Sequence, residues 1–252
     1  IRDSPNIGYK MLNFKQFLFE ETAAGIQHLE HPSDRTFDGQ KSAEHAVKTL
    51  HNIASGREPI TRKIDDKLSF QAIRTPEGKV GVKYKGPGSH YNFSDNDIDK
   101  QHGHKPYLVK PLKLLQRHLA KVLPSRPGEY QGGFMSSSED RNEREGNIEH
   151  TPNTITYHTP ASSEEGKKLK RSKVSAVIHT ELQGPEKTAK PILDTSEFGS
   201  HPDVHLVNHV VTKQQQKLSS EDKNTVHSHI AEAQKLMQNH SYGHLAGHEQ
   251  TL

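Results

Sequence analysis

One stretch of alternating residues constrains the fold more than any other part of the chain. Between residues 60 and 73, apolar side chains fall on even positions (Ile64, Leu68, Phe70 and Ala72), and polar side chains fall on the odd positions 63–71. A period of two is typical of a half-buried β-strand. A Thr-Pro-Glu-Gly turn follows at residues 75–78, and the alternation resumes over residues 79–85. The pattern predicts a β-hairpin.

Helical periodicity and short apolar runs predict the remaining elements. Helices are expected at residues 41–54, at 107–123 and after Ser219, and short strands at 129–135, 153–158, 174–182 and 204–211. Polar residues predict loops at 86–104 and 136–150, and the basic run at 167–173 is expected on a loop or a strand approach. We therefore expect an α+β fold, mainly an antiparallel sheet with flanking helices. The expected divisions are an extension (1–25), a core (26–212), and a C-terminal helix and tail (213–252).

Composition limits the core and excludes several classes of protein. Apolar residues make up 30% of the 252 residues, and no run approaches the ~18–20 apolar residues that a transmembrane helix needs. The chain has no cysteine, which excludes disulfides, thiolate zinc sites and cysteine nucleophiles. The net charge of +3 is too small for a polybasic nucleic-acid coat. We expect a compact centre with long polar loops and no membrane partner.

Histidine is abundant, with 19 residues, but its spacing favours no metal site. His201, His205 and His209 are four residues apart, which suits a zinc site only on a helix. Residues 204–211 instead have the pattern of a strand, where residues four apart are about 13 Å apart. The sequence identifies no metal ligands, and Glu181 is the nearest candidate for a metal-facing carboxylate. His179, in the middle of an expected strand, is either a pocket residue or a core histidine.

The Lys63-Ile64-Asp65 sequence is the most informative point for chemistry. In a strand, Lys63 and Asp65 share the face opposite the buried side chains. A lysine amine becomes a nucleophile when desolvation or neighbouring cations favour its neutral form. Arg62 and Lys67, with Lys83 and Lys85 on the partner strand, supply such cations, and these also suit a triphosphate. The alternative is an ordinary solvated strand face.

Several blocks of the chain resemble an uncharacterised family of tailed-phage proteins. Residues 60–66 resemble the family pattern I-T-x-K-W-D-G, and residues 81–85 follow after a turn, where the family has V-G-T-K-S. Residues 130–135 correspond to Y-Q-G-D-L-M. The blocks Pro-Asn-Thr-Ile-Thr-Tyr (152–157) and Lys-Val-Ser-Ala-Val-Ile-His-Thr (173–180) continue the match. The resemblance extends from about residue 28 to residue 184.

The K-x-D-G pattern of that family is in turn similar to the nucleotide-binding motif of ATP-dependent DNA and RNA ligases and capping enzymes. This resemblance implies a ligase-like nucleotidyltransferase (adenylation-domain) fold. It also implies a lysine that attacks the α-phosphate of ATP and carries the nucleotide. On that basis Lys63 is the nucleophile, Asp65 lies near the ribose, and Lys83 or Lys85 lies near the phosphates. Mg²⁺ would bridge phosphate oxygens, and a nucleic acid is a candidate acceptor.

Two residues depart from the pattern. Asp66 stands where the motif has glycine, and Gly133 stands where the phage family has an acid. A ligase-like Glu-Gly strand and a late Lys-x-Lys are also missing in clean form. Because of these departures, the alternative is that the chain is a non-catalytic member of the group.

The beginning of the chain resembles the capsid-targeting leader of internal head proteins in large contractile-tailed phages. Residues 11–20 form an amphipathic pattern that ends Leu18-Phe19-Glu20, and we expect the true start at Met11. In such leaders a prohead protease cuts after a glutamate, so Leu18 and Glu20 would mark a cleavage before Glu21. The alternative function is therefore a packaged, non-enzymatic head protein. Its partners would be the head scaffold and the protease, and its location the virion interior or the host cytoplasm.

Overall fold

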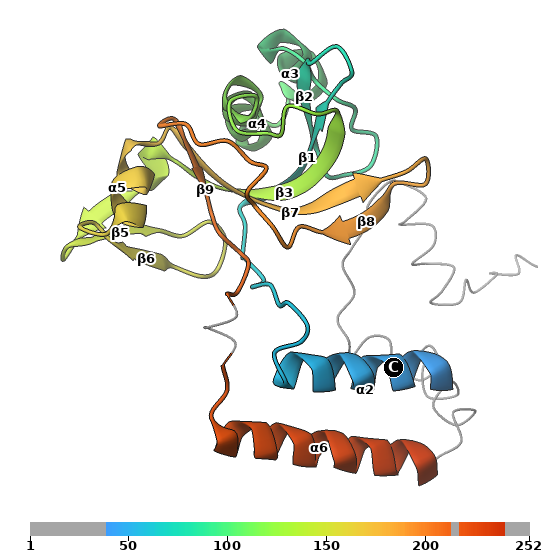
Figure 1. Cartoon of the computed structure of the whole chain (residues 1–252). Helices are drawn as coiled ribbons and strands as arrows, with labels where there is room; N and C mark the ends of the chain where they lie inside the picture. Colours follow the sequence, from blue (N-terminus) through green and yellow to red (C-terminus); the bar gives the residue numbers. More distant parts are fainter. Residues whose placement is uncertain (1–38, 213–216, 240–252) are drawn as a thin grey trace, which may run out of the picture.

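A computed structural model describes residues 39–212 and 217–239, which form an α+β fold, as expected (Figure 1). The larger sheet has the strand order β2-β1-β3-β7-β8, and β9 pairs with β7 in parallel. Its strands are β1 (Leu68–Arg74), β2 (Val80–Tyr84), β3 (Gly128–Ser137), β7 (Val174–Gln183), β8 (Thr188–Pro191) and β9 (Val204–Leu206). All its other pairings are antiparallel.

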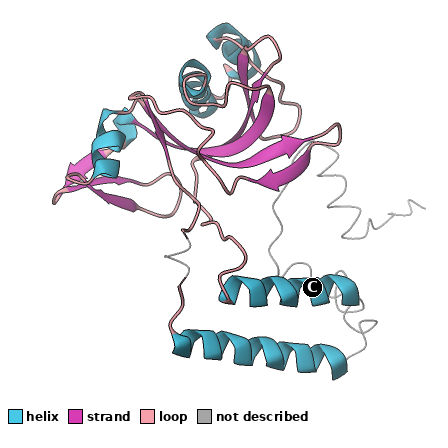
Figure 2. Cartoon of the chain, viewed as in Figure 1, coloured by secondary structure: helices cyan, strands magenta, loops and turns pink. Residues whose placement is uncertain are grey.

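Helices cover one face of this sheet and form the core with it (Figure 2). Helix α4 (Pro106–Leu119) packs on β2, β3 and β7, with α3 (Asp95–His102) beside it. The apolar side of α4 is the expected stripe: Leu108, Leu112, Leu115 and Leu119, all buried. Phe70 and Tyr130 of the sheet are buried in the same core. The hairpin β1–β2 and the long helix of the sequence analysis are confirmed.

A smaller sheet, β4-β5-β6, lies to one side with helix α5 (Figure 1). Its strands are β4 (Asn142–Arg144), β5 (Asn147–His150) and β6 (Tyr157–Pro160), and α5 spans Glu164–Arg171. The prediction of a loop over 136–150 was wrong, because the two-residue turn Glu145-Gly146 joins β4 to β5 with positive φ at both positions (51° and 76°). Such a turn favours Asn-Gly or Asp-Gly, so glutamate at the first position conceals it.

Two further segments form helices that the sequence analysis missed. The basic run 167–173 lies mostly in α5, where Ser163 accepts a hydrogen bond from Gly166 N and caps the first turn. Acidic residues at the start of α5 and basic residues at its end complement the helix dipole. Within the expected loop 86–104, Ser94 caps α3 in the same way by accepting from Asp97 N.

The strand expected from residue 60 begins only at Leu68. Thr61 instead forms an isolated bridge with Val210, and Arg62 N donates to His209 O at 2.7 Å. Lys63 and Asp65 therefore do not share a strand face. The apolar alternation is misleading here because the partners of this segment lie about 70–150 residues away in the sequence, outside any local pattern.

Helices α2 (Gln40–Ala54) and α6 (Ser220–Asn239) lie side by side, apart from the larger sheet (Figure 1). The rings of His51 and His227 stack between them, with centroids 5.1 Å apart. Both helices were expected from their periodicity. In the part of the chain that the structure describes, no helix combines the length and the apolar character needed to cross a membrane.

We predict that His150→Phe weakens the acid sensitivity of the fold. His150 is buried, its ring stacks on Tyr157, and among the residues that the structure describes neither ring nitrogen has a hydrogen-bond partner. Burial lowers its pKa from 6.5 to about 4, so the unfolded chain takes up this proton first as the pH falls from 6.5 to 4. Stability is lost over that window, by up to roughly 3 kcal/mol for such a shift.

Phenylalanine keeps the stack and removes the titration. Urea unfolding at pH 7 and pH 4.5 should therefore show a smaller loss of stability in His150→Phe than in the wild type. His104→Gln, at an exposed position, is the control and should keep the wild-type difference. An unchanged difference in His150→Phe would contradict the prediction.

Candidate functional site

The face of the larger sheet opposite α4 is lined by polar side chains. In one row across four strands, Lys83 of β2 lies opposite Gln71 of β1, Gln71 opposite Gln131 of β3, and Gln131 opposite Thr180 of β7. Their neighbours in the strands point the other way, into the apolar core. We call this surface the polar face. An antiparallel sheet commonly has one apolar and one polar face, and we examine the polar one as the candidate site because it carries the lysines singled out from the sequence.

The side chains in the middle of the polar face are buried although they are polar. Gln71, Gln131 and Thr180 are 1%, 2% and 0% exposed. Gln71 Nε2 donates to Gln131 Oε1 at 3.3 Å. Buried amides and hydroxyls destabilise a fold unless they are hydrogen-bonded, and both glutamines have such partners.

Charged groups surround this row. The ammonium group of Lys83 lies 4.7 Å from the centroid of the Tyr91 ring. Glu129 of β3 accepts a hydrogen bond from Tyr91 Oη and pairs with Lys187. Burial lowers the pKa of Lys83, while the charge of Glu129 opposes that shift. The edge of the polar face thus holds two lysines and one carboxylate.

His179 and Lys85 lie further along the polar face. Gln131 pairs with Thr180, but Gly132 pairs with Ile178, so His179 is the extra residue of a β-bulge. Its Nδ1 lies 2.7 Å from Thr180 Oγ1. Burial lowers the pKa of His179 to about 4, with smaller effects from His209 and Lys85, so the ring is neutral at pH 7. A neutral imidazole can both donate and accept hydrogen bonds here.

Residues 60–67, which we call the K-x-D segment, lie beside this sheet and are held by backbone hydrogen bonds at both ends. Its start pairs with residues 209–211, and at its end Lys67 N donates to Phe134 O at 2.9 Å. Lys63 is exposed and, within the described residues, makes no hydrogen bond or ion pair with Lys83, Lys85 or His179. Arg62 is exposed too. The structure therefore brings Lys83, Lys85 and His179 to one face, and leaves Lys63 and Arg62 on the neighbouring segment.

Asp65 joins the K-x-D segment to the Pro-Asn-Thr-Ile block. Its carboxylate accepts hydrogen bonds from Asn153 Nδ2 (3.0 Å), Thr154 N (2.8 Å), Thr154 Oγ1 (3.2 Å) and Ile155 N (3.1 Å). Asp65 N donates to Tyr157 Oη at 2.8 Å. Two blocks that are 88 residues apart in sequence are thus in contact. The role of Asp65 near a ribose stays a prediction, and its carboxylate already has four donors in this arrangement.

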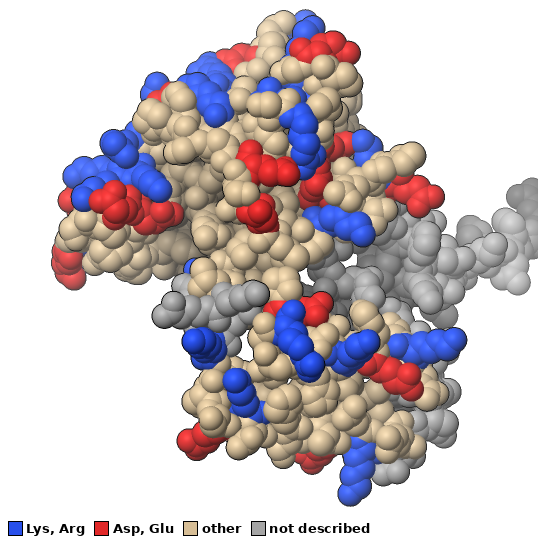
Figure 3. All heavy atoms as spheres, in the orientation of Figure 1, with Lys and Arg blue, Asp and Glu red and all other residues tan. Residues whose placement is uncertain are grey.

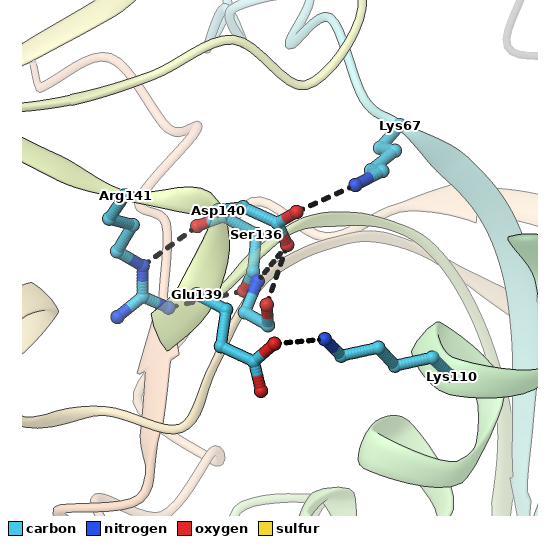
Figure 4. A network of polar contacts seen from close by, with 7 residues as sticks. Lys67, Lys110, Ser136, Glu139, Asp140 and Arg141 are labelled. Carbon is cyan, nitrogen blue, oxygen red and sulfur yellow. Dashed lines mark hydrogen bonds and ion pairs between the residues drawn. The ribbon is translucent and has the colours of Figure 1, made fainter.

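A second network holds the end of the same segment (Figure 4). Lys67 Nζ lies 2.8 Å from Asp140 Oδ1, and Asp140 Oδ2 accepts from Ser137 N and Ser137 Oγ, both at 2.7 Å. Burial tends to raise the pKa of Asp140, but hydrogen bonds from Lys67 and from the side chain and backbone of Ser137 lower it to about 2. Arg141 donates to Ser136 Oγ at 2.9 Å. The network therefore fixes the K-x-D segment to the junction of the two sheets.

The other candidate residues have structural partners. Glu181 pairs with Arg126 at 2.5 Å and shares the α4 side of the sheet with Tyr130, so it does not face the polar face. His209 Nε2 lies 3.0 Å from Ile192 O. His205 Nδ1 lies 2.8 Å from Ser175 Oγ, and His205 Nε2 lies 2.6 Å from Glu165 Oε1. Ser175 is fully buried, so a substrate cannot reach its hydroxyl group. We therefore interpret this Ser-His-Glu row as a structural link between β7, β9 and α5.

The acids of the polar face are compatible with Mg²⁺. No group of three or more His, Asp or Glu residues that could hold a metal occurs in 39–212 and 217–239. Mg²⁺ bound with a nucleotide needs only one or two carboxylates besides the phosphate oxygens. Asp66 and Glu129 both face this side of the sheet, and Glu129 already pairs with Lys187.

The visible surface carries no broad basic patch. In Figure 3, Lys and Arg are interspersed with Asp and Glu. On α5, Lys167 pairs with Glu164 and Lys170 pairs with Glu143. The proposed cleavage residues Leu18 and Glu20 lie outside the described residues.

The fold and the polar face thus define an α+β protein with a candidate site on its sheet. A model described as a family of unknown function (DUF6267) matches residues 82–251, which is 170 of the 252 residues. The chain belongs to this family. The match includes Lys83, Lys85 and His179 but not the K-x-D segment. No curated protein and no solved structure matches the chain.

We predict that Asp65→Asn loosens the 153–155 loop. The backbone of Thr154 and Ile155 lowers the pKa of Asp65 below 3.8, so its contribution to stability is present above that pH and is lost as the pH falls further. The nearly isosteric amide keeps one acceptor but loses the charge, so the Thr154 and Ile155 amides should exchange faster with solvent. Hydrogen exchange measured by NMR at pH 6 checks this.

Asp194→Asn is a suitable control, because within the described residues Asp194 is bonded to the nearby Ser196, whose backbone N donates to it at 2.8 Å. It should leave the exchange of the two loop amides unchanged. Equal protection of these amides in wild type and Asp65→Asn would show that the carboxylate does not hold the loop.

Proposed function

We propose that the chain is a ligase-like covalent nucleotidyltransferase that binds ATP on the polar face and uses Lys63 as its nucleophile. The observation that carries the proposal is the polar row of the sheet, with lysines at its edge and the K-x-D segment alongside. Lys83 and Lys85 suit phosphate groups, because a partly buried ammonium group gains more from an anion than an exposed one. The larger sheet would then serve as an adenylation-type core.

The proposed reaction follows from the chemistry of the amine. The neutral amine of Lys63 attacks the α-phosphorus, a P–N bond forms, and the bond from the α-phosphorus to the bridging oxygen breaks. Pyrophosphate leaves, and the proton of the nitrogen passes to solvent. Mg²⁺, when bound with the nucleotide, would neutralise charge on the phosphate oxygens. Neutral His179 would donate a hydrogen bond to the nucleotide, and a nucleic acid is the proposed acceptor.

The first experiment is labelling of the full chain with α-³²P-ATP and Mg²⁺. Wild type should take up acid-labile label that survives alkali, as a phosphoamide does, and pyrophosphate should discharge it. Lys63→Ala and Lys63→Arg should take up none. Lys79→Ala, which changes an exposed lysine of the β1–β2 turn, is the matched control and should label normally.

Label that persists in Lys63→Ala would exclude this lysine as the nucleophile. Absence of label from wild type with each of the four ribonucleoside triphosphates would refute covalent transfer altogether. The chain would then be a non-catalytic member of the group, for which nucleotide binding remains a separate question.

The second experiment measures nucleotide binding without transfer. Calorimetry with α,β-methylene-ATP should show that Lys83→Met and Lys85→Met each weaken binding roughly tenfold, because a contact from a cation to a phosphate contributes on the order of 1.5 kcal/mol. Methionine keeps most of the buried length of lysine and removes the charge. Lys79→Met should bind as wild type does, and equal affinities for all variants would place the phosphates elsewhere.

A further inference from the structure

Asp66 and Gly133 occupy one position in space. Gly133 lies in β3 directly opposite Ser69 of β1, and Asp66 lies at the end of the K-x-D segment. A Cβ atom built on Gly133 would overlap Asp66 Cβ and Oδ2 and would lie 2.5 Å from Asp66 Cγ. The space that a side chain at position 133 would need is therefore filled by the Asp66 carboxyl group.

This carboxyl group lies on the polar face. Residue 133 alternates with Phe134, which is buried in the core on the α4 side, so position 133 faces the opposite side. Ser69 Oγ is 3.3 Å from both carboxylate oxygens, a long contact for a hydroxyl group and an acid. Burial raises the pKa of Asp66, and the charge of Lys85 opposes that shift.

The environment of Asp66 differs from that of the other acids close to it. Asp65 has four donors, and Glu129 pairs with Lys187 and Tyr91. Asp66 has only the two long contacts with Ser69 within the described residues, so its oxygens keep lone pairs for a further ligand. A half-buried carboxylate with such contacts, close to lysines suited to phosphates, matches the one-carboxylate coordination that Mg²⁺ uses with nucleotides.

We propose that Asp66 supplies the metal-facing carboxylate of the site, and that Gly133 is the vacancy that admits it. The proposal rests on the proposed nucleotide site.

The test exchanges the two residues. Four variants are compared with wild type: Asp66→Gly, Gly133→Asp, the interchange Asp66→Gly/Gly133→Asp, and the filler Asp66→Gly/Gly133→Ala. Gly133→Asp alone should unfold at a lower temperature, because its side chain overlaps Asp66. The interchange and the filler should both unfold at a higher temperature than Gly133→Asp, because neither contains the overlapping pair of side chains.

Metal binding then shows whether Asp66 acts as a ligand through its carboxylate or only fills the space over Gly133. The probe is Mn²⁺ with α,β-methylene-ATP, followed by water proton relaxation. Asp66→Gly and the filler should bind Mn²⁺–nucleotide roughly tenfold or more weakly than wild type, the interchange should bind within about threefold of it, and metal-free nucleotide binding should change little.

Unaltered Mn²⁺–nucleotide binding in Asp66→Gly would overturn the inference, and so would a filler that binds as well as the interchange. Covalent labelling is scored separately. If Asp66 governs Mn²⁺ binding but wild type takes no label, the metal role stands and covalent transfer fails. If wild type takes up label and Asp66→Gly binds Mn²⁺–nucleotide normally, covalent transfer stands and the metal role of Asp66 fails. No Mn²⁺–nucleotide binding by wild type would overturn both.

Discussion

The hydrogen bonds of the Asp65 carboxylate determine how the two sheets and the candidate site fit together. One side chain accepts from two backbone amides and two side chains of residues 153–155, and so fixes the K-x-D segment to the chain that leads into β6. Bonds from an ionised acceptor are stronger than neutral ones. Lys67 and Asp140 add a second attachment a few residues later. The position of the segment beside the polar face follows from these contacts together with its backbone hydrogen bonds to residues 209–211 and to Phe134.

The two faces of the larger sheet have opposite physical roles. The face toward α4 buries Phe70, Ala72 and their neighbours, which supply the hydrophobic free energy of the core. The other face carries Gln71, Gln131 and Lys83 in register, where apolar residues would stabilise the fold more. Within the described residues, Gln71 donates to Gln131, so the buried row is held by its own hydrogen bonds. In the function proposed above, this face is the one that would take the nucleotide.

The sequence predicted the elements whose signal is local. The β1–β2 hairpin and helix α4 follow from periods of two and 3.6, and the structure contains both. It also predicted Lys83 and Lys85 on one strand; Lys83 lies in β2, and Lys85 follows directly after the end of that strand. It could not predict that Asp65 binds residues 153–155 or that Asp66 fills the space over Gly133, because no pattern in one sequence links positions 67–90 residues apart. The β4–β5 turn was missed because Glu145 adopts a conformation that favours asparagine or glycine.

The anchoring of the K-x-D segment also bears on the proposed chemistry. Lys63 lies between Arg62, whose backbone is bonded to His209, and Asp65, whose carboxylate is fixed to the 153–155 loop. A main chain held on both sides within two residues leaves the proposed nucleophile only the freedom of its own side chain. In the proposed reaction the backbone would therefore lose little further entropy when the amine reaches the α-phosphorus, and the side chain would bear the remaining loss. The exposed position of Lys63 then leaves its four-carbon stem free to turn toward a nucleotide, while the backbone beneath it stays in place.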